Sequence, residues 1–310
     1  MKGKVLVTDT LFITDEHIRK IEDSGYVVER LEKADATENE LIKALQGKTG
    51  YILGGIEKVT SRVIASAKDL KAIAFTGADW QAIIPGWETA KDRGIKISNA
   101  PGANSPAVAE FSIALALLMQ RNLIEVGRTG DVKFQTTRTL HNATIGVIGA
   151  GKIGTRIIKS VLRFEPRKVQ YYSRTQKSEI DSLGVEFTDL NNLLESSDVI
   201  FVAAPGSAGR ILDKEAITNI KNDALLVHIS PFNMIDFDAL LERLKTGSIR
   251  AAIDWPAPNE EFLKLPNHIW YNTNNHTAYN THSVIKLCSD MGTKSLLNLL
   301  DSGEDEFRVI

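Results

Sequence analysis

The chain has 310 residues, about twice the size of a typical domain, so two domains with separate hydrophobic cores are expected. Lys and Arg number 37 against 39 for Asp and Glu, which leaves no basic excess for nucleic acid. The longest largely apolar run, Phe111 to Met119, has nine residues including Ser112, whereas a membrane span needs roughly twenty. A single cysteine, Cys288, excludes an intrachain disulfide, and the N-terminus lacks an apolar signal region. Together they predict a cytoplasmic protein.

Short β-branched runs alternate with helical periods through the first hundred residues. A helix is predicted over 14–23, and a second follows Thr37 and Glu40, which form a capping-box pattern. This alternation predicts a mostly parallel sheet covered on both faces. The predicted strands are 5–8, 26–31, 51–53, 72–75 and 95–98.

A second alternating set follows a break at Pro101 and Gly102. A long apolar helix is predicted from about 106 to 127, and a polar stretch over 128–142 leads into the new set. A final helix over 282–300 is expected to return to the first domain. The six strands of the second set are predicted at 144–148, 169–172, 185–187, 199–203, 224–229 and 249–254, with helices starting near 153, 176, 189, 213 and 236.

A glycine-rich turn, Gly149-Ala150-Gly151-Lys152-Ile153-Gly154, lies directly between the strand over 144–148 and an amphipathic helix. Its first glycine permits the tight turn, its second lets backbone approach a pyrophosphate, and its third lets the helix pack close to the strand. The helix N-terminus offers N–H groups and a positive dipole to phosphates. The pattern predicts dinucleotide binding; the alternative is a turn that serves only the connection.

The end of the second strand of this set indicates which dinucleotide is preferred. An NAD enzyme usually places Asp or Glu there against the ribose 2′-hydroxyl. Here the residues are Ser173, Arg174 and Thr175, which can hydrogen-bond and neutralise a 2′-phosphate. NADP(H) is therefore predicted in preference to NAD(H), unless Arg174 is only a solvated loop charge.

The order of these motifs resembles that of the D-isomer-specific 2-hydroxyacid dehydrogenase family over nearly the whole chain. Residues 98–110 look like the family's hinge, and 144–154, 224–236 and 251–254 follow in the family's order. The resemblance implies an α/β protein of two doubly wound parallel-sheet domains. A flavodoxin-like, split substrate-binding domain would consist of residues 1–100 and 282–310, and a Rossmann domain for NAD(P) would occupy 101–281.

The family transfers a hydride between nicotinamide and a 2-keto or 2-hydroxy acid, with a histidine that exchanges the proton. Histidine suits this role because its unperturbed pKa lies near neutrality. His276 matches the family's catalytic position, and Asp254 matches the aspartate that faces the nicotinamide carboxamide. Further cofactor contacts implied by the resemblance are Ala204, Pro205, Ile229 and Ser230.

The chain departs from the family at two catalytic positions. Pro231 stands where the family has the arginine that anchors the substrate carboxylate, and proline has neither side-chain charge nor N–H. Asn259 stands where the glutamate partner of the histidine is expected, and Glu260 directly after it is the candidate replacement. Three explanations stay open: another basic group, such as Arg210, replaces the arginine, the substrate is not an ordinary 2-keto acid, or the protein binds cofactor without turnover.

On the substrate side, the loop after the strand over 72–75 resembles the family's loop whose backbone N–H groups hold the substrate carboxylate. Gly77 and Ala78 are the candidates, with a plain turn as the alternative. Asn104 also lies toward the substrate in the resemblance, or else caps a helix. Three tryptophans, Trp80, Trp87 and Trp255, either shape the pocket or belong to the core.

These inferences predict an oxidoreductase that prefers NADP(H), accepts a small carboxylate substrate and uses no metal. The alternative is a catalytically impaired dehydrogenase homologue that acts as an NAD(P)-binding sensor or interaction module. The resemblance also implies a homodimer formed through the long apolar helix. The apolar residues of that helix include Ala107, Phe111, Ala114, Leu115, Leu118 and Met119.

Overall fold

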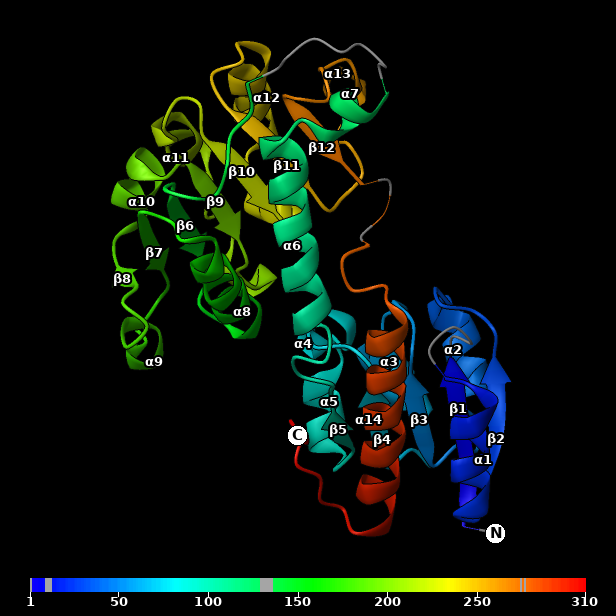
Figure 1. The fold of residues 1–310 in the computed structure, drawn as a ribbon. Coiled ribbons are helices and arrows are strands. Elements are labelled where there is room, and N and C mark those ends of the chain that lie inside the picture. The colour runs from blue at the N-terminus through cyan, green and yellow to red at the C-terminus, as the bar shows by residue number, and fades with distance from the viewer. Residues whose placement is uncertain (1, 9–12, 129–135, 274, 276) are drawn as a thin grey trace. The chain divides into compact units, whose positions relative to one another are not determined.

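The computed structural model describes residues 2–8, 13–128, 136–273, 275 and 277–310, which form two compact units (Figure 1). The terminal unit consists of residues 1–104 and 281–310, and the inserted unit of residues 105–280. These limits differ from the sequence expectation by one residue at the second crossing and by four at the first. The first unit is therefore built from both ends of the chain.

The terminal unit has one sheet of five parallel strands in the order β2-β1-β3-β4-β5, which is the flavodoxin-like order. The helix α14 (His282–Asp301) contacts β3 and β4, and it completes the layer that the first hundred residues leave unfinished. The strands are β1 (Gly3–Thr8), β2 (Tyr26–Leu31), β3 (Gly50–Leu53), β4 (Ala72–Phe75) and β5 (Lys96–Ser98). The other helices are α1 (Asp15–Asp23), α2 (Glu38–Ala44), α3 (Ser61–Ser66), α4 (Trp80–Ile83) and α5 (Trp87–Asp92).

Local signals explain where these elements begin. The predicted capping box at the start of α2 is present: the Thr37 side chain accepts from Glu40 N, and the Glu40 carboxylate accepts from Thr37 N at 2.7 Å. That backbone bond and Lys33 lower the pKa of Glu40 to about 2. All residues of β3 and β4 are buried, as expected for parallel strands covered on both faces.

The inserted unit has one sheet of seven parallel strands in the order β12-β11-β10-β9-β6-β7-β8, the doubly wound order of dinucleotide-binding domains with one strand added. Its strands are β6 (Thr144–Ile148), β7 (Lys168–Tyr172), β8 (Glu186–Phe187), β9 (Val199–Val202), β10 (Leu225–His228), β11 (Arg250–Ile253) and β12 (Trp270–Asn272). Its α-helices are α6 (Ser105–Gln120), α7 (Leu123–Arg128), α8 (Lys152–Val161), α9 (Ser178–Asp181), α10 (Leu190–Ser196), α11 (Lys214–Asn219), α12 (Phe237–Lys245) and α13 (Glu260–Leu263).

The long helix predicted over 106–127 is interrupted. Asn122 has a φ of 49°, the left-handed region that asparagine tolerates, and it separates α6 from α7. The buried Arg250 at the start of β11 donates to Gln120 Oε1 at 2.7 Å and Met119 O at 3.3 Å, so it occupies the carboxyl end of α6. Burial lowers the pKa of Arg250 to about 10.

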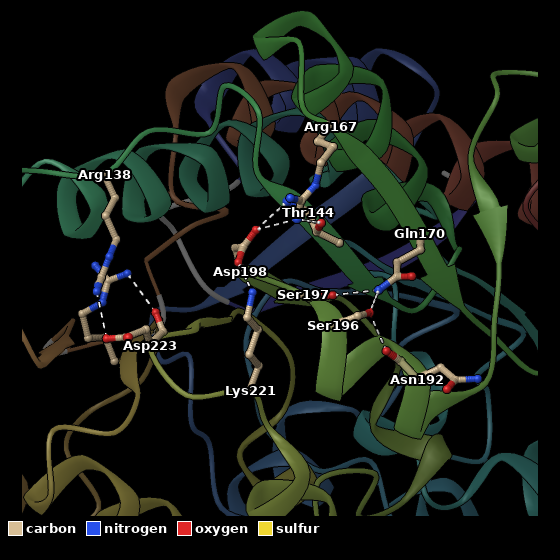
Figure 2. Close-up of polar contacts among 11 residues, drawn as sticks. Arg138, Thr144, Arg167, Gln170, Asn192, Ser196, Ser197, Asp198, Lys221 and Asp223 are labelled. Atoms are coloured by element: carbon tan, nitrogen blue, oxygen red, sulfur yellow. Dashed lines mark hydrogen bonds and ion pairs between the residues drawn. The ribbon is translucent and has the colours of Figure 1, made fainter.

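Polar contacts connect the amino ends of β6 and β9 and link the middle of β7 to the segment before β9 (Figure 2). Asp198 before β9 accepts from the Thr144 backbone N–H at 2.7 Å and pairs with Lys221 at 2.5 Å. Gln170 in β7 donates to Ser196 and Ser197. Burial acts to raise the pKa of Asp198, but the bonds from Lys221 and Thr144 outweigh it and hold that pKa below its ordinary value. This arrangement leaves the carboxyl edge for ligands, as in other doubly wound sheets.

Candidate functional site

The three glycines of the turn after β6 have different surroundings. Gly149 has a φ of 98°, and a Cβ there would collide with the backbone of Ala203 and Ala204 beyond β9. A Cβ at Gly154 would collide with the carbonyl oxygen of Gly149. At Gly151, in contrast, a Cβ would meet nothing within 4 Å. The first and third glycines are therefore required by packing, and the second faces open space.

That open space lies at the N-terminus of α8, whose N-cap is Gly151 and receives no side-chain capping bond. Uncapped N–H groups and the helix dipole favour an anion there. Lys152 is exposed beside them, while Ile153 packs against the core of the unit. The geometry fits a dinucleotide pyrophosphate, with Ala204 and the exposed Pro205 beyond β9.

The end of β7 carries a cation and no carboxylate. Ser173 Oγ donates to Thr175 O at 2.6 Å, which closes the turn. Arg174 is exposed, and its guanidinium makes no hydrogen bond or ion pair with any residue the structure describes. Nearby, Tyr171 Oη accepts from Lys177 N at 2.7 Å and shapes the following loop. The arrangement leaves the positive charge of Arg174 without a partner among the described residues at the end of β7.

The end of β10 is apolar where the family has an arginine. Ser230 is buried, and its Oγ donates to Val202 O at 2.9 Å. Ile229 beside it is also buried. Pro231 lies 3.2 Å from the position that a Cβ on Gly206 would take. No charged side chain replaces the arginine within this turn.

Aromatic side chains continue that apolar surface. Phe232 is 39% exposed and stacks on Phe237, with ring centroids 4.3 Å apart. Trp255 lies edge-on to Phe232 at 6.3 Å, and its indole N–H donates to Ser230 O at 2.7 Å. The turn after β10 therefore presents aromatic edges rather than hydrogen-bond donors.

Asp254, directly after β11, is fully buried and holds the segment that follows β12. Its carboxylate accepts from Thr273 Oγ1 at 3.0 Å, from Thr277 N at 2.9 Å and from Ala278 N at 2.9 Å. Bonds of a carboxylate to several N–H groups are strong. The role of Asp254 in facing the nicotinamide stays a prediction; in the structure its oxygens accept from Thr273, Thr277 and Ala278.

Of the two catalytic candidates, His276 and Glu260, only Glu260 is among the described residues. His276 lies outside the described residues, so its predicted role stays a prediction. Glu260 begins α13, is exposed, and makes no hydrogen bond or ion pair within the described part of the chain. The helix is capped by Asn259, whose side chain accepts from Glu261 N at 3.0 Å. Within the described ranges, no group of three or more His, Cys, Asp or Glu residues could hold a metal ion.

The candidate substrate loop belongs to the terminal unit. Its carbonyl groups are used: Gly77 O accepts from Ala100 N at 2.9 Å, and Ala78 O accepts from Asn99 Nδ2 at 2.8 Å. The N–H groups of Gly77 and Ala78 donate to no described residue. Asn104 is half-buried, and its amide likewise has no hydrogen bond to the described residues. Hydrogen bonds to the carbonyl groups of Gly77 and Ala78 therefore hold the loop in place, while their N–H groups have no partner among the described residues.

Comparison with known proteins identifies the family. A profile of the D-isomer specific 2-hydroxyacid dehydrogenase NAD binding domain matches residues 113–277. A hydroxypyruvate reductase of Thermotoga maritima is 32% identical over 232 residues, which cover 72% of each chain. A solved structure from Thermus thermophilus has a TM-score of 0.88 at 27% identity, over 99% of this chain and 100% of that one. The chain belongs to the D-isomer specific 2-hydroxyacid dehydrogenase family.

Some relatives are longer than this chain. A D-3-phosphoglycerate dehydrogenase of Archaeoglobus fulgidus is 31% identical over 319 aligned residues, which cover 96% of this chain but 59% of that protein. The chain thus spans little more than half the length of that relative. The predictions of an α/β fold with two parallel sheets and of a nicotinamide dinucleotide-binding domain are confirmed. None of the helices in the described ranges is long and apolar enough to cross a membrane.

Proposed function

We propose that this chain is an oxidoreductase that prefers NADP(H) and interconverts a small 2-keto acid and its 2-hydroxy acid. The observation that carries the proposal is the complete glycine turn, in which Gly149 and Gly154 are required by packing and Gly151 borders open space. A ligand that approaches the backbone closely would account for a glycine at the second position, where packing does not require one. Family membership adds the reaction class.

The inserted unit would hold the dinucleotide by its backbone. The turn over 149–154 and the start of α8 would bind the pyrophosphate, and the ends of β9 and β10 would flank the nicotinamide side. When bound, the nicotinamide cofactor supplies or accepts the hydride. Arg174 would pair with a 2′-phosphate, because a guanidinium with no other partner in the described structure gains most from a dianionic ligand.

His276 would hold the proton of the reaction. In the reducing direction, the carbonyl carbon C2 gains the hydride and the carbonyl oxygen gains the proton from His276, which leaves a neutral imidazole. Oxidation of the hydroxy acid reverses both transfers. The carboxylate of Asp254 would act as a positioning group, since it binds Thr277 and Ala278 next to the histidine. Glu260 is the proposed carboxylate partner of His276.

The substrate carboxylate would bind to the unused N–H groups of Gly77 and Ala78, with Asn104 as a further donor. Without an arginine at position 231, polarisation of the carbonyl falls to another group. Arg210 is exposed on the loop after β9 and makes no ion pair among the described residues. Loss of a preorganised donor typically costs about 10²- to 10³-fold in rate, so turnover on ordinary 2-keto acids is expected to be slow.

The experiment is to follow NADPH and NADH absorbance with a panel of 2-keto acids, beginning with glyoxylate and hydroxypyruvate, the substrates in the names of the relatives. His276→Ala should abolish turnover and leave NADPH affinity unchanged, and Arg210→Gln should lower turnover further. The control is Lys214→Gln, an exposed residue of α11. Absence of turnover with every acid, or full activity in His276→Ala, would contradict the proposal.

The turn around Pro231 favours a second candidate, a cofactor-binding module that has lost catalysis. Its apolar surface, with Phe232 exposed, lacks the donor that the reaction normally uses. In this case calorimetry should show NADPH binding but no binding of any keto acid to the binary complex. Binding of a keto acid to the complex with NADPH would instead support the oxidoreductase and contradict the loss of catalysis.

A homodimer through α6 belongs to the same proposal. Leu115 and Met119 lie in the core of the inserted unit, whereas Ala114 is exposed and Phe111 and Leu118 are only partly buried. These last three would supply the interface. Sedimentation equilibrium of the chain and of Ala114→Glu tests this: the variant should be monomeric, and a monomeric wild type would contradict the proposal.

A further inference from the structure

A hollow of about 410 Å³ lies on the terminal unit, beside β5. Its walls come from α4, α5, the start of β5 and the last residues of the chain, which lie side by side (Figure 1). The last residues run antiparallel to β5, with Val309 N donating to Ile97 O at 2.7 Å. The hollow shares no residue with the loop over 77–79 or with Asn104. Its volume is in the range of small-molecule sites.

The lining combines aromatic surface with positive charge. Trp80 and Trp87 form an edge-to-face pair with centroids 6.0 Å apart. Three of the ten lining residues have cationic side chains, Lys91, Lys96 and Arg308, and no lining side chain is acidic; one backbone acceptor of the lining, Ile310 O, is already bound by Arg308 Nε at 2.7 Å. A site of this composition selects anions over cations and offers flat apolar surface to the rest of the ligand.

The donors of the hollow are largely unused. Lys96 is half-buried, and its Nζ lies next to Gly303 outside the lining, yet the ammonium makes no hydrogen bond or ion pair with any residue that the structure describes. The same holds for Lys91 and for the indole N–H groups of Trp80 and Trp87. Arg308 differs, because it pairs with Glu304 at 2.7 Å and donates to Gly303 O at 3.1 Å, both outside the lining, and to Ile310 O at 2.7 Å within it. A half-buried cation that lacks a counter-ion gains from an anionic ligand, since part of its desolvation has already occurred.

We propose that this hollow is a second ligand site, separate from the catalytic one, for an amphipathic organic anion. The flat apolar body of the ligand packs against Trp80 and Trp87. Its carboxylate pairs with the ammonium groups of Lys96 and Lys91. The site therefore recognises a carboxylic acid with an aromatic body, and it rejects the amine of the same shape.

The test uses two probes with the same ring and opposite charge, indole-3-acetate and tryptamine. The chain has four tryptophans, whose ¹⁵N-labelled indole N–H signals report on location. Indole-3-acetate should shift the Trp80 and Trp87 signals saturably and leave Trp255 and Trp270 unmoved, with or without NADPH. Tryptamine should shift none. Equal binding of both probes, or shifts confined to Trp255, would overturn the proposal.

Matched variants locate the anion contact. Lys96→Gln should weaken indole-3-acetate binding by about tenfold or more, the usual contribution of a hydrogen bond to a charged group, and Lys91→Gln should weaken it as well. Lys43→Gln, an exposed lysine of α2 outside the hollow, should not. Thermal midpoints and NADPH affinity establish that each variant is folded. If Lys96→Gln unfolds the chain, Lys91→Gln carries the test, and equal affinities for Lys91→Gln and Lys43→Gln would contradict the site.

Discussion

Arg174 is a single residue on which cofactor choice is predicted to depend. Its guanidinium has no hydrogen bond or ion pair among the described residues, and no carboxylate lies in the turn over 173–175 to repel a 2′-phosphate. A free cation at this place contributes little to the fold. Its contribution is therefore expected in the difference between the two cofactors.

Arg174→Gln should weaken NADPH binding by about tenfold or more, because a hydrogen bond to a charged group contributes about 1.5 to 3 kcal/mol. Affinity for NADH should not change, since NADH lacks the 2′-phosphate. Calorimetric titration of both cofactors measures the ratio directly. The matched control is Lys177→Gln, three residues further on, and an equal loss for both cofactors in Arg174→Gln would contradict this role.

The sequence identified Asp254 as a candidate site residue, but it did not predict which groups its carboxylate binds. The motif order located the aspartate after β11, but the donors that bind it among the described residues include 273, 277 and 278, and only the fold brings them to it. Asp254→Asn keeps the shape but turns an acceptor into a donor that faces N–H groups. We predict a fall in turnover with unchanged NADPH affinity, measured by steady-state rates and calorimetry. A loss of NADPH affinity instead would mean that Asp254 contacts the nicotinamide.

At the level of elements, the turn between β6 and α8 contains one glycine that packing requires, Gly154, and one that is predicted to contact the cofactor, Gly151. Gly154→Ala places a methyl group against the carbonyl of Gly149 and should lower the thermal midpoint. Gly151→Ala places its methyl group in open space at a φ of −82°, which any residue adopts. This variant should fold normally but lose NADPH affinity. Thermal melts beside calorimetry distinguish the two, and normal NADPH binding by Gly151→Ala would argue against a pyrophosphate in this turn.

Elements with strong local signals could be predicted from sequence, and those set by tertiary contacts could not. The strand 144–148 and the α2 capping box agree with the structure because hydrophobic runs and cap residues act locally. The strand β12 was missed because its three residues carry no pattern of their own and pair only with β11. The break at Asn122 was also missed: the apolar pattern continues past it, whereas in the structure α6 ends at Gln120, which the distant Arg250 contacts.

At the scale of the whole molecule, each unit has its own interior. Every residue of the two core clusters around β6 and β10 belongs to the inserted unit, and every residue of the two clusters around β1 and β4 belongs to the terminal unit. The site assignments divide in the same way. The candidate cofactor residues lie in residues 105–280, while Gly77, Ala78 and the hollow beside β5 lie in the terminal unit.

Because the predicted sites lie in different units, each ligand is expected to stabilise mainly the unit that binds it. A ligand that binds only one folded unit stabilises that unit by about 2.7 kcal/mol at one hundred times its Kd. Saturating NADPH should therefore slow amide hydrogen exchange in β6, α8 and β10 and leave β1 and β3 nearly unchanged, whereas indole-3-acetate should protect α5 and β5. Hydrogen-exchange mass spectrometry with each ligand measures both patterns on the intact chain. The Gly151→Ala variant is the control, because it should lose the NADPH effect alone; equal protection of both units by NADPH would show that they open together.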